Sequence, residues 1–207
     1  MEKKLALAAV SVAALFVAGT WAMTQMNKSD MDFATCGAAA VAGSAIGGPF
    51  ELIDKDGKTV TDADIITGPT LLYFGYTFCP DVCPTDNLRN ADAVQLLEDK
   101  GIMVTPVFIS IDPARDTPQV VGEFADNFHP RMIGLTGSAE QVSAASLAYR
   151  TYYKKEETED EYYLMDHSVQ SYFNIPGYGV IDLFGRSETP QEAADRMACL
   201  IDMTSEN

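Results

Sequence analysis

Two cysteines, Cys79 and Cys83, are the residues of this 207-residue chain best suited to chemistry. Three residues separate them, and in a turn or a first helical turn this spacing brings both sulfur atoms to one side. A pair of soft thiolates suits Cu(I) or zinc, and the same two thiols could instead close into a disulfide. The spacing therefore indicates either a metal site or a redox-active pair.

One of the two histidines is a candidate third ligand. His129 precedes Pro130 at an expected helix end, where a turn or the helix dipole accounts for it. His167 closes an expected strand, and together with the two thiols it would complete a Cys₂His set. Such a set suits copper in either oxidation state, whereas zinc would need a fourth ligand or water.

Two aspartates flank these candidates, Asp81 between the cysteines and Asp166 beside the histidine. Either carboxylate could orient a ligand or offset the charge of a bound cation. Capping of a turn explains both residues equally well.

The element that must position the thiols is an apolar and aromatic run, 70–75, which is typical of a strand buried on both faces. A helix is expected over 85–100 and a second apolar strand over 102–111, where Pro106 suggests a bulge or an edge. A strand, a helix and a strand predict a parallel pair with a right-handed crossover. In such sheets ligands collect at the carboxyl ends of the strands, and a helix N-terminus there lowers thiol pKa values.

The other segments predict further strands and helices around this unit. A hairpin is expected over 50–61 and another over 150–166, and a strand pair is expected over 171–182. Helices should begin at Pro118, after Ser138 in a capping box, and at Pro190 after Thr189 in a second capping box. Val120, Val121, Phe124 and Phe128 are expected on the buried face of the first of these helices. The pattern is that of an α/β domain.

The loop 112–118 carries Arg115 between Asp112 and Asp116. We interpret the arginine as part of an ion pair that fixes the loop, because such pairs commonly brace turns.

The formal net charge of −16 excludes one class of partner. A phosphate backbone requires a basic face, and the chain has no Lys/Arg cluster of the size that nucleic acid would need. No nucleic-acid partner is expected.

Residues 5–23 hold no charged side chain, which predicts a single membrane-spanning anchor over 5–24. Lys3 and Lys4 would keep residues 1–4 in the cytoplasm. A cleaved signal peptide is the rival interpretation, but signal sequences usually have a shorter apolar stretch. A flexible tether is expected over 25–48 and a folded domain over 49–207, outside the cytoplasm.

Cys36 in the tether and Cys199 in the last helix remain. They could pair with each other in an oxidising compartment, although nothing local requires it. We interpret both as structural or incidental.

Four separated blocks, 75–84, 112–118, 134–137 and 166–168, together resemble the Sco/SenC family of membrane-tethered copper proteins. The resemblance runs from about Phe50 to Met203. It implies a thioredoxin-like domain, with a central mixed sheet flanked by helices, behind the N-terminal transmembrane helix. The family's site residues fall on Cys79, Cys83 and His167, which would bind one copper as Cu(I) or Cu(II).

The same resemblance implies a copper metallochaperone. Its expected partners are cytochrome c oxidase subunit II, whose binuclear copper site the family helps to assemble by copper delivery or thiol reduction, and other copper chaperones. The expected location is the inner membrane, with the domain facing the periplasm or the mitochondrial intermembrane space.

An enzyme with turnover is not the expectation, but one alternative stays open. A membrane-tethered thiol-disulfide oxidoreductase would use Cys79 and Cys83 as its redox pair, although thioredoxin-type catalysts usually carry C-x-x-C. A redox or copper sensor would use the same residues. A dithiol catalyst does not need His167, so this residue discriminates between the hypotheses.

Overall fold

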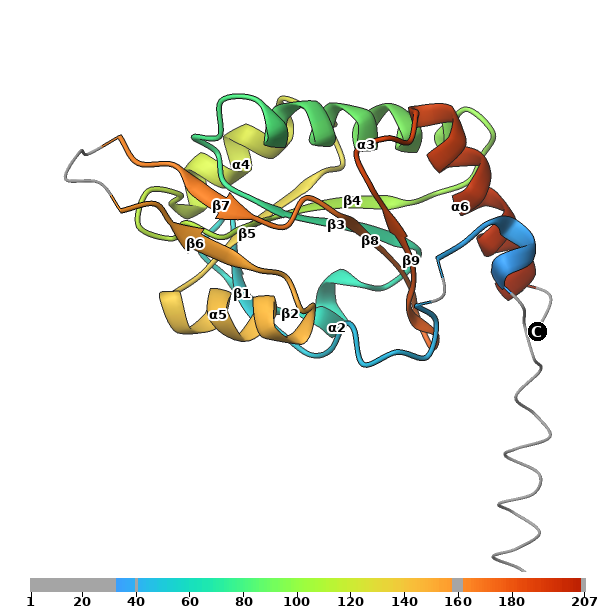
Figure 1. Cartoon of the computed structure of the whole chain (residues 1–207), viewed down its shortest axis with the longest axis horizontal. Coiled ribbons are helices and arrows are strands. Elements are labelled where there is room, and N and C mark those ends of the chain that lie inside the picture. Colours follow the sequence, from blue (N-terminus) through green and yellow to red (C-terminus); the bar gives the residue numbers. More distant parts are fainter. Residues whose placement is uncertain (1–32, 40, 158–161, 206–207) are drawn as a thin grey trace, which may run out of the picture. The chain divides into compact units, whose positions relative to one another are not determined.

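The computed structural model describes residues 33–39, 41–157 and 162–205. Its main feature is a seven-stranded sheet with the order β2-β1-β5-β4-β3-β8-β9, and a separate two-stranded sheet is formed by β6 and β7 (Figure 1). The strands are β1 (Glu51–Asp54), β2 (Thr59–Thr61), β3 (Thr70–Gly75), β4 (Thr105–Ser110), β5 (Ile133–Thr136), β6 (Tyr153–Lys155), β7 (Met165–His167), β8 (Ser171–Ile175) and β9 (Gly179–Phe184). The helices are η1 (Phe33–Cys36), α2 (Asp62–Ile65), α3 (Val82–Glu98), α4 (Pro118–Asp126), α5 (Ala139–Ala148) and α6 (Pro190–Ser205).

The predicted parallel pair is present at the centre of the sheet. β3 pairs with β4 in parallel, Tyr73 opposite Phe108, and β4 pairs in parallel with β5. The outer strands are antiparallel, because β1 and β2 extend one edge and β8 and β9 extend the other. The sheet is therefore mixed, as the family resemblance implies.

Pro106 lies in a central strand without breaking it. It pairs with Leu71 of β3, whereas the register with β5 begins one residue later, at Val107. Thr105 donates its N–H to Pro69 on the β3 side, so the nitrogen of the next residue faces away from β3. The missing N–H of Pro106 therefore removes no hydrogen bond between strands. The edge suggested by the sequence is limited to this residue, which has no partner in β5.

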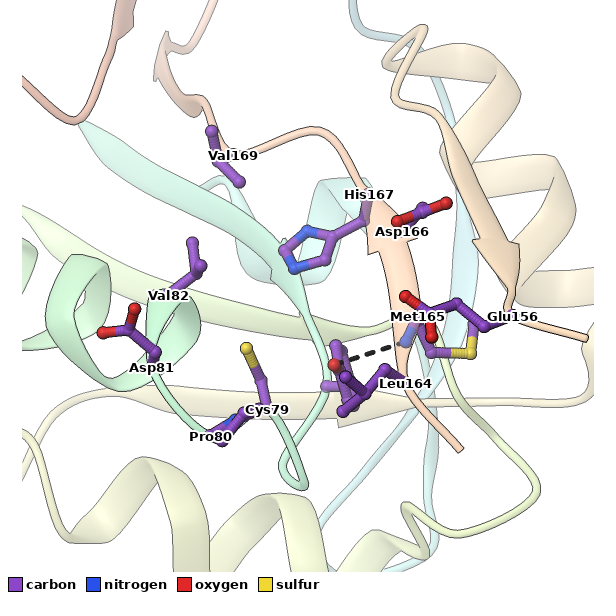
Figure 2. Close-up of a pocket in the computed structure, with 11 residues that line it drawn as sticks. Cys79, Pro80, Asp81, Val82, Glu156, Leu164, Met165, Asp166, His167 and Val169 are labelled. Carbon is purple, nitrogen blue, oxygen red and sulfur yellow. Dashed lines mark hydrogen bonds between the residues drawn. The ribbon is translucent and has the colours of Figure 1, made fainter. Parts of the chain in front are cut away.

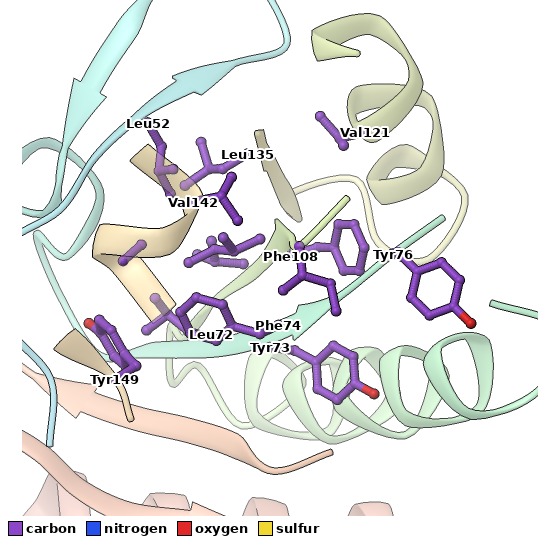
Figure 3. Close-up of a cluster of buried hydrophobic side chains, with 14 of the residues drawn as sticks. Leu52, Leu72, Tyr73, Phe74, Tyr76, Phe108, Val121, Leu135, Val142 and Tyr149 are labelled. Atoms are coloured by element: carbon purple, nitrogen blue, oxygen red, sulfur yellow. The ribbon is translucent and has the colours of Figure 1, made fainter. Parts of the chain in front are cut away.

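Helices cover both faces of the sheet. Figure 1 shows α3 and α4 along one face and α5 with α2 on the other. One buried cluster joins Leu72, Phe74 and Phe108 of the sheet to Val121 of α4 and Val142 of α5 (Figure 3). A second cluster joins α3 and α6 to the strands β8 and β9. The large apolar core anchors β3, the strand that precedes the cysteines, and every residue of β3 is buried.

The helix starts follow the predicted capping chemistry. Ser138 and Gln141 form the reciprocal capping box of α5, and Thr189 and Glu192 exchange the same two bonds at α6. The prediction that Val120 lies on the buried face of α4 is wrong, because 36% of this residue is exposed. Val121 beside it is fully buried, as predicted. The short helix α2 was not anticipated, since four residues are too few to show a helical period.

The predicted anchor over 5–24 lies outside the described residues. Within the ranges described, no helix has both the length and the apolar character needed to span a bilayer. The boundary expected between tether and domain at residues 48 and 49 stays a prediction. Residues of the predicted tether nevertheless contact the domain, since η1 lies against α6 and a disulfide joins Cys36 to Cys199 with 5.8 Å between their Cα atoms.

Candidate metal centre

The two sulfur atoms of the candidate site come from a loop and the helix that follows it. Cys79 lies in the loop after β3, and Cys83 lies in the first turn of α3, which begins three residues earlier than predicted. The backbone N–H of Cys83 donates to the Cys79 sulfur over 3.3 Å. Cys83 is fully buried, whereas 9% of Cys79 is exposed. Cys79 is therefore the outer ligand candidate and Cys83 the inner one.

A glycine makes room for the inner sulfur. A Cβ atom added to Gly75 would lie 2.8 Å from the Cys83 sulfur and 2.8 Å from the ring of Tyr73. No side chain larger than hydrogen fits at the end of β3 while Cys83 keeps its place.

His167 reaches the thiols from a different element. It ends β7, and its Nε2 atom lies 3.4 Å from the Cys83 sulfur. The other ring nitrogen, Nδ1, lies 2.7 Å from the carbonyl oxygen of Ser168, which can only accept a hydrogen bond. Nδ1 is thus the protonated nitrogen, and the lone pair of Nε2 is directed at the sulfurs.

The sulfur atoms of Cys79 and Cys83 and a nitrogen of His167 all lie within 4.8 Å of one another. In the part of the chain that the structure describes, no other set of three His, Cys, Asp or Glu residues meets this criterion. The arrangement offers a metal two soft sulfur donors and one imidazole nitrogen. The structure thus brings together the three residues that the sequence singled out.

Two tyrosine rings pack against the imidazole ring of His167. The rings of Tyr73 and Tyr76 meet His167 edge to face, with centroids 6.4 and 5.7 Å away. The hydroxyl of Tyr73 donates to the buried carboxylate of Asp86 over 3.1 Å, and the hydroxyl of Tyr76 accepts the N–H of Met165 over 3.3 Å. Both contacts restrict how the ring can move relative to the thiols.

The cysteine loop is braced from the neighbouring strand end. Buried Asp116 accepts bonds from the N–H and the hydroxyl of Thr77, and from the hydroxyl of Ser110 at the end of β4. Parallel strands place their carboxyl ends at one edge of the sheet, so the two loops meet there.

The loop 112–118 also reaches the strand pair that carries the histidine. Arg115 donates to Asp112 over 2.5 Å and to the backbone oxygen of Tyr163 over 2.9 Å. Its guanidinium lies 3.6 Å from the centre of the Tyr163 ring, and the Tyr163 hydroxyl donates to Asp112. Arg115 therefore forms the loop-fixing ion pair that we expected. Asp116, in contrast, binds the cysteine loop.

The site opens to solvent through a cleft of about 260 Å³ (Figure 2). Cys79 and His167 line it, and its acidic residues are Asp81, Glu156 and Asp166. Asp81 and Asp166 are both exposed, and neither belongs to the close group of ligand atoms. Asp81 precedes α3 as its N-cap residue but makes no side-chain cap bond. The cleft is consequently acidic around its soft donors.

Comparison with known proteins identifies the family. The sequence model of the family described as SCO1/SenC matches residues 38–202, which is most of the chain. The protein SenC of Rhodobacter capsulatus is 49% identical over 202 residues, which are 97% of this chain and 91% of the relative. The chain belongs to the SCO1/SenC family.

Solved SCO1/SenC structures have the same fold. The copper-bound structure of Arabidopsis thaliana ScoI is 42% identical, with a TM-score of 0.71 over 78% of this chain and 99% of the relative. The copper-bound structure of Bradyrhizobium japonicum ScoI is 38% identical, with a TM-score of 0.68 over 74% of this chain and 98% of the relative. Both relatives were solved with copper bound.

In this SCO1/SenC domain the two thiols differ in acidity. The neighbouring Cys83 thiol lowers the pKa of the Cys79 thiol well below its usual range, and the backbone N–H of Cys83 acts in the same direction. The contact with the Cys79 sulfur and burial together raise the pKa of the Cys83 thiol. The outer sulfur, that of Cys79, is therefore the more acidic of the two.

Burial changes the acidity of the groups around the SCO1/SenC site as well. It raises the pKa of Tyr76 to about 12 and raises the pKa of the Asp86 carboxyl, which Arg89 opposes. Tyr76 thus keeps its proton in neutral solution.

Sequence reasoning missed the residues that orient the ligands. Tyr73 lies in the apolar run 70–75 and Tyr76 follows it directly, and Gly75 gave no signal apart from its place before the turn. His129, the other histidine, is buried beside Glu98 and does not line the cleft. Its assignment to a turn outside the site agrees with this position.

Proposed function

We propose that this chain is a copper metallochaperone that binds one copper ion through the sulfurs of Cys79 and Cys83 and through Nε2 of His167. The observation that carries the proposal is that these ligand atoms lie within 4.8 Å of one another, with the Nε2 lone pair left for a metal by the Nδ1 bond to Ser168. Two thiolates hold Cu(I), and the imidazole supports Cu(II). Two relatives solved with copper bound support the choice of metal.

The cargo is transferred by ligand exchange at the cleft. Cys79 and His167 line the opening, whereas Cys83 is fully buried behind them. Incoming thiolates or imidazoles of a partner therefore reach the copper on the side of the two outer ligands, and the Cys83 sulfur is the last to be released. The three carboxylates of the cleft attract a cationic cargo or a basic patch on the acceptor.

The acceptor that we propose is the binuclear copper site of cytochrome c oxidase subunit II, to which the chain delivers copper or whose thiols it reduces. Family membership supports this assignment. The N-terminal segment 5–24 would anchor the domain to the inner membrane through the tether, with the domain facing the periplasm or the intermembrane space. Tethering raises the local concentration of the domain near a membrane-bound acceptor.

The experiment that tests copper binding is a titration of the full chain, with Cys79 and Cys83 reduced, against Cu(I) and Cu(II). Absorption and electron paramagnetic resonance spectra are recorded beside Cys79→Ser, Cys83→Ser and His167→Ala. One copper per chain, with thiolate-to-Cu(II) bands lost in all three variants, is the expected result. His129→Asn is the matched control and should keep the bands, because His129 does not line the cleft. Unchanged stoichiometry and affinity in His167→Ala would remove the histidine from the site.

A thiol-disulfide oxidoreductase is the second candidate, favoured by one arrangement. The sulfur of Cys79 is partly accessible, and the buried thiol of Cys83 lies beside it. In a dithiol catalyst the accessible thiol attacks the substrate disulfide and the neighbouring thiol then resolves the mixed disulfide. If the chain fails to bind copper tightly and a readily reduced Cys79–Cys83 disulfide exchanges with an added dithiol, this function replaces the first. Exchange activity that survives His167→Ala would strengthen it.

A further inference from the structure

A second group of sulfur atoms lies away from the cleft, where η1 meets α6. Cys36 of η1 is bonded to Cys199 of α6, and the Cys36 sulfur is also 3.2 Å from the Sδ atom of Met203. The hydroxyl of Thr35 donates to the same Sδ atom over 3.6 Å. We call Cys36, Cys199 and Met203 the terminal sulfur cluster. Figure 1 shows η1 and the end of α6 at the opposite end of the domain from β7, which carries His167.

The helix itself keeps two of the three sulfurs together. Cys199 and Met203 are four residues apart within α6, so their side chains point to the same face of the helix. The candidate copper site also has two donors four residues apart, Cys79 and Cys83, with a third from another element. The terminal sulfur cluster has the same arrangement of two donors four residues apart and a third from another element, but one of its donors is a thioether.

Contacts other than the disulfide hold η1 against the domain. The ring of Phe33 packs edge to face on Tyr178, with centroids 6.2 Å apart, and the N–H of Ala39 donates to the buried carboxylate of Asp182 over 2.8 Å. Asp182 is in turn paired with Arg196 of α6 at 2.6 Å. Cys36 therefore stays close to Cys199 and Met203 when the sulfur-sulfur bond is broken.

We propose that reduction of the Cys36–Cys199 disulfide creates a second Cu(I) site, with two thiolate ligands and the thioether of Met203. A dithiol reductant supplies two electrons and two protons, its own two sulfurs form a disulfide, and the Cys36–Cys199 bond opens to two thiols. Each thiol loses its proton as the metal binds. Thiolate and thioether are soft ligands that select Cu(I), and the oxidised cluster has no thiolate to offer.

The disulfide is open to such a reductant. Cys199 is exposed and Cys36 is only half-buried, so a dithiol can reach the bridge from solvent. The flexible side chain of Met203 can adjust to the longer separations that a shared metal requires. The cluster thus gains a copper ion only under reducing conditions, and this inference does not depend on the function proposed for the cleft.

The test uses the full chain carrying Cys79→Ser and Cys83→Ser, which silences the thiols of the cleft. The chain competes for Cu(I) with the chelator bicinchoninate under anaerobic conditions. The measurement is made on the oxidised chain and again after reduction with a dithiol, which is removed before Cu(I) is added. Thiol titration should find two new thiols per chain after reduction, and one Cu(I) should bind in that form only. Equal binding before and after reduction, or a bridge that no dithiol opens in the folded chain, would overturn the proposal.

Two single changes within this background decide the ligands. Met203→Leu should weaken Cu(I) binding about tenfold or more, which corresponds to roughly 1.4 kcal/mol or more. Met103→Leu is the matched control, because Met103 is exposed and belongs to neither site, and it should leave the affinity unchanged. Binding that Met203→Leu does not alter would exclude the thioether. Cys199→Ser should abolish binding, and retention of the ion would place it elsewhere.

Discussion

The hydroxyl of Tyr76 accepts the backbone N–H of Met165 over 3.3 Å. This bond links the residue that follows β3, just before the cysteine loop, to β7, the strand that ends in His167. Figure 2 shows it as the dashed line beneath the histidine. The same tyrosine packs its ring against the imidazole. One side chain therefore sets both the position of β7 and the orientation of its histidine. Disturbing this bond should change the metal site without removing a ligand.

Tyr76→Phe should weaken copper binding about fivefold, since a long hydrogen bond contributes roughly 1 kcal/mol. The ring contact with His167 remains in this variant, so the loss reports on the position of β7. Chelator competition with Cu(I) measures the affinity. Tyr152→Phe is the matched control, because Tyr152 is exposed and does not line the cleft. Equal affinities of the two variants would contradict the role given to the Tyr76 hydroxyl.

Gly75→Ala should lower the free energy of unfolding by about 1–3 kcal/mol, because the new methyl group overlaps the Cys83 sulfur and the Tyr73 ring. Copper affinity should fall as well, since the inner sulfur must move. Urea unfolding and chelator competition measure the two effects. Gly68→Ala serves as control, because no atom lies within 4 Å of its added Cβ and its φ is not positive. If the Gly75→Ala chain matched the control in both stability and copper affinity, the space around Cys83 would be large enough for a methyl group, contrary to the structure.

His129 should make stability depend on pH below about 6.5, the usual pKa of histidine. Burial lowers the pKa of His129 in the folded chain, opposed by Glu98, while Arg131 acts with burial. The unfolded chain thus takes up the proton first, so the stability present above pH 6.5 is lost as the pH falls, by at most about 1.4 kcal/mol per unit.

His129→Asn tests this dependence. Its side-chain oxygen can still accept the N–H of Arg131, as the Nδ1 atom of His129 does over 3.2 Å, but it does not titrate. Urea unfolding between pH 8 and 5 should show a flatter decline for the variant than for the parent. Both chains keep His167, so the difference isolates His129. Parallel curves would assign the acid sensitivity to other groups.

The two proposed cysteine ligands and the helix caps could be predicted from the sequence because each depends on a short segment of the chain. The spacing of Cys79 and Cys83 after a buried strand follows from the chain itself, and the capping boxes at Ser138 and Thr189 are motifs of four residues. The parallel pairing of β3 and β4 follows from the helix between them. The cysteine spacing and the capping boxes depend on neighbours a few residues away, and the pairing of β3 with β4 depends on one continuous strand-helix-strand segment.

The supporting residues were not accessible in the same way. Gly75 is needed because the Cys83 sulfur and the Tyr73 ring lie against it, and the bond between Asp116 and Thr77 joins two different loops. Nothing within either loop requires these contacts. The pairing of Cys36 with Cys199 is similar, because it joins residues separated by 163 positions.

The sequence by itself determined most of the helices and strands of this protein, the identity of its soft donors and its family resemblance, because periodicity, caps and motifs are properties of short segments. Only the tertiary structure decided that Nε2 of His167 faces the Cys83 sulfur and that Arg115 stacks on Tyr163. It alone brought Met203 to the terminal cysteines. These relations are set by how helices and strands pack on one another, and packing depends on the shapes of many side chains distant in sequence.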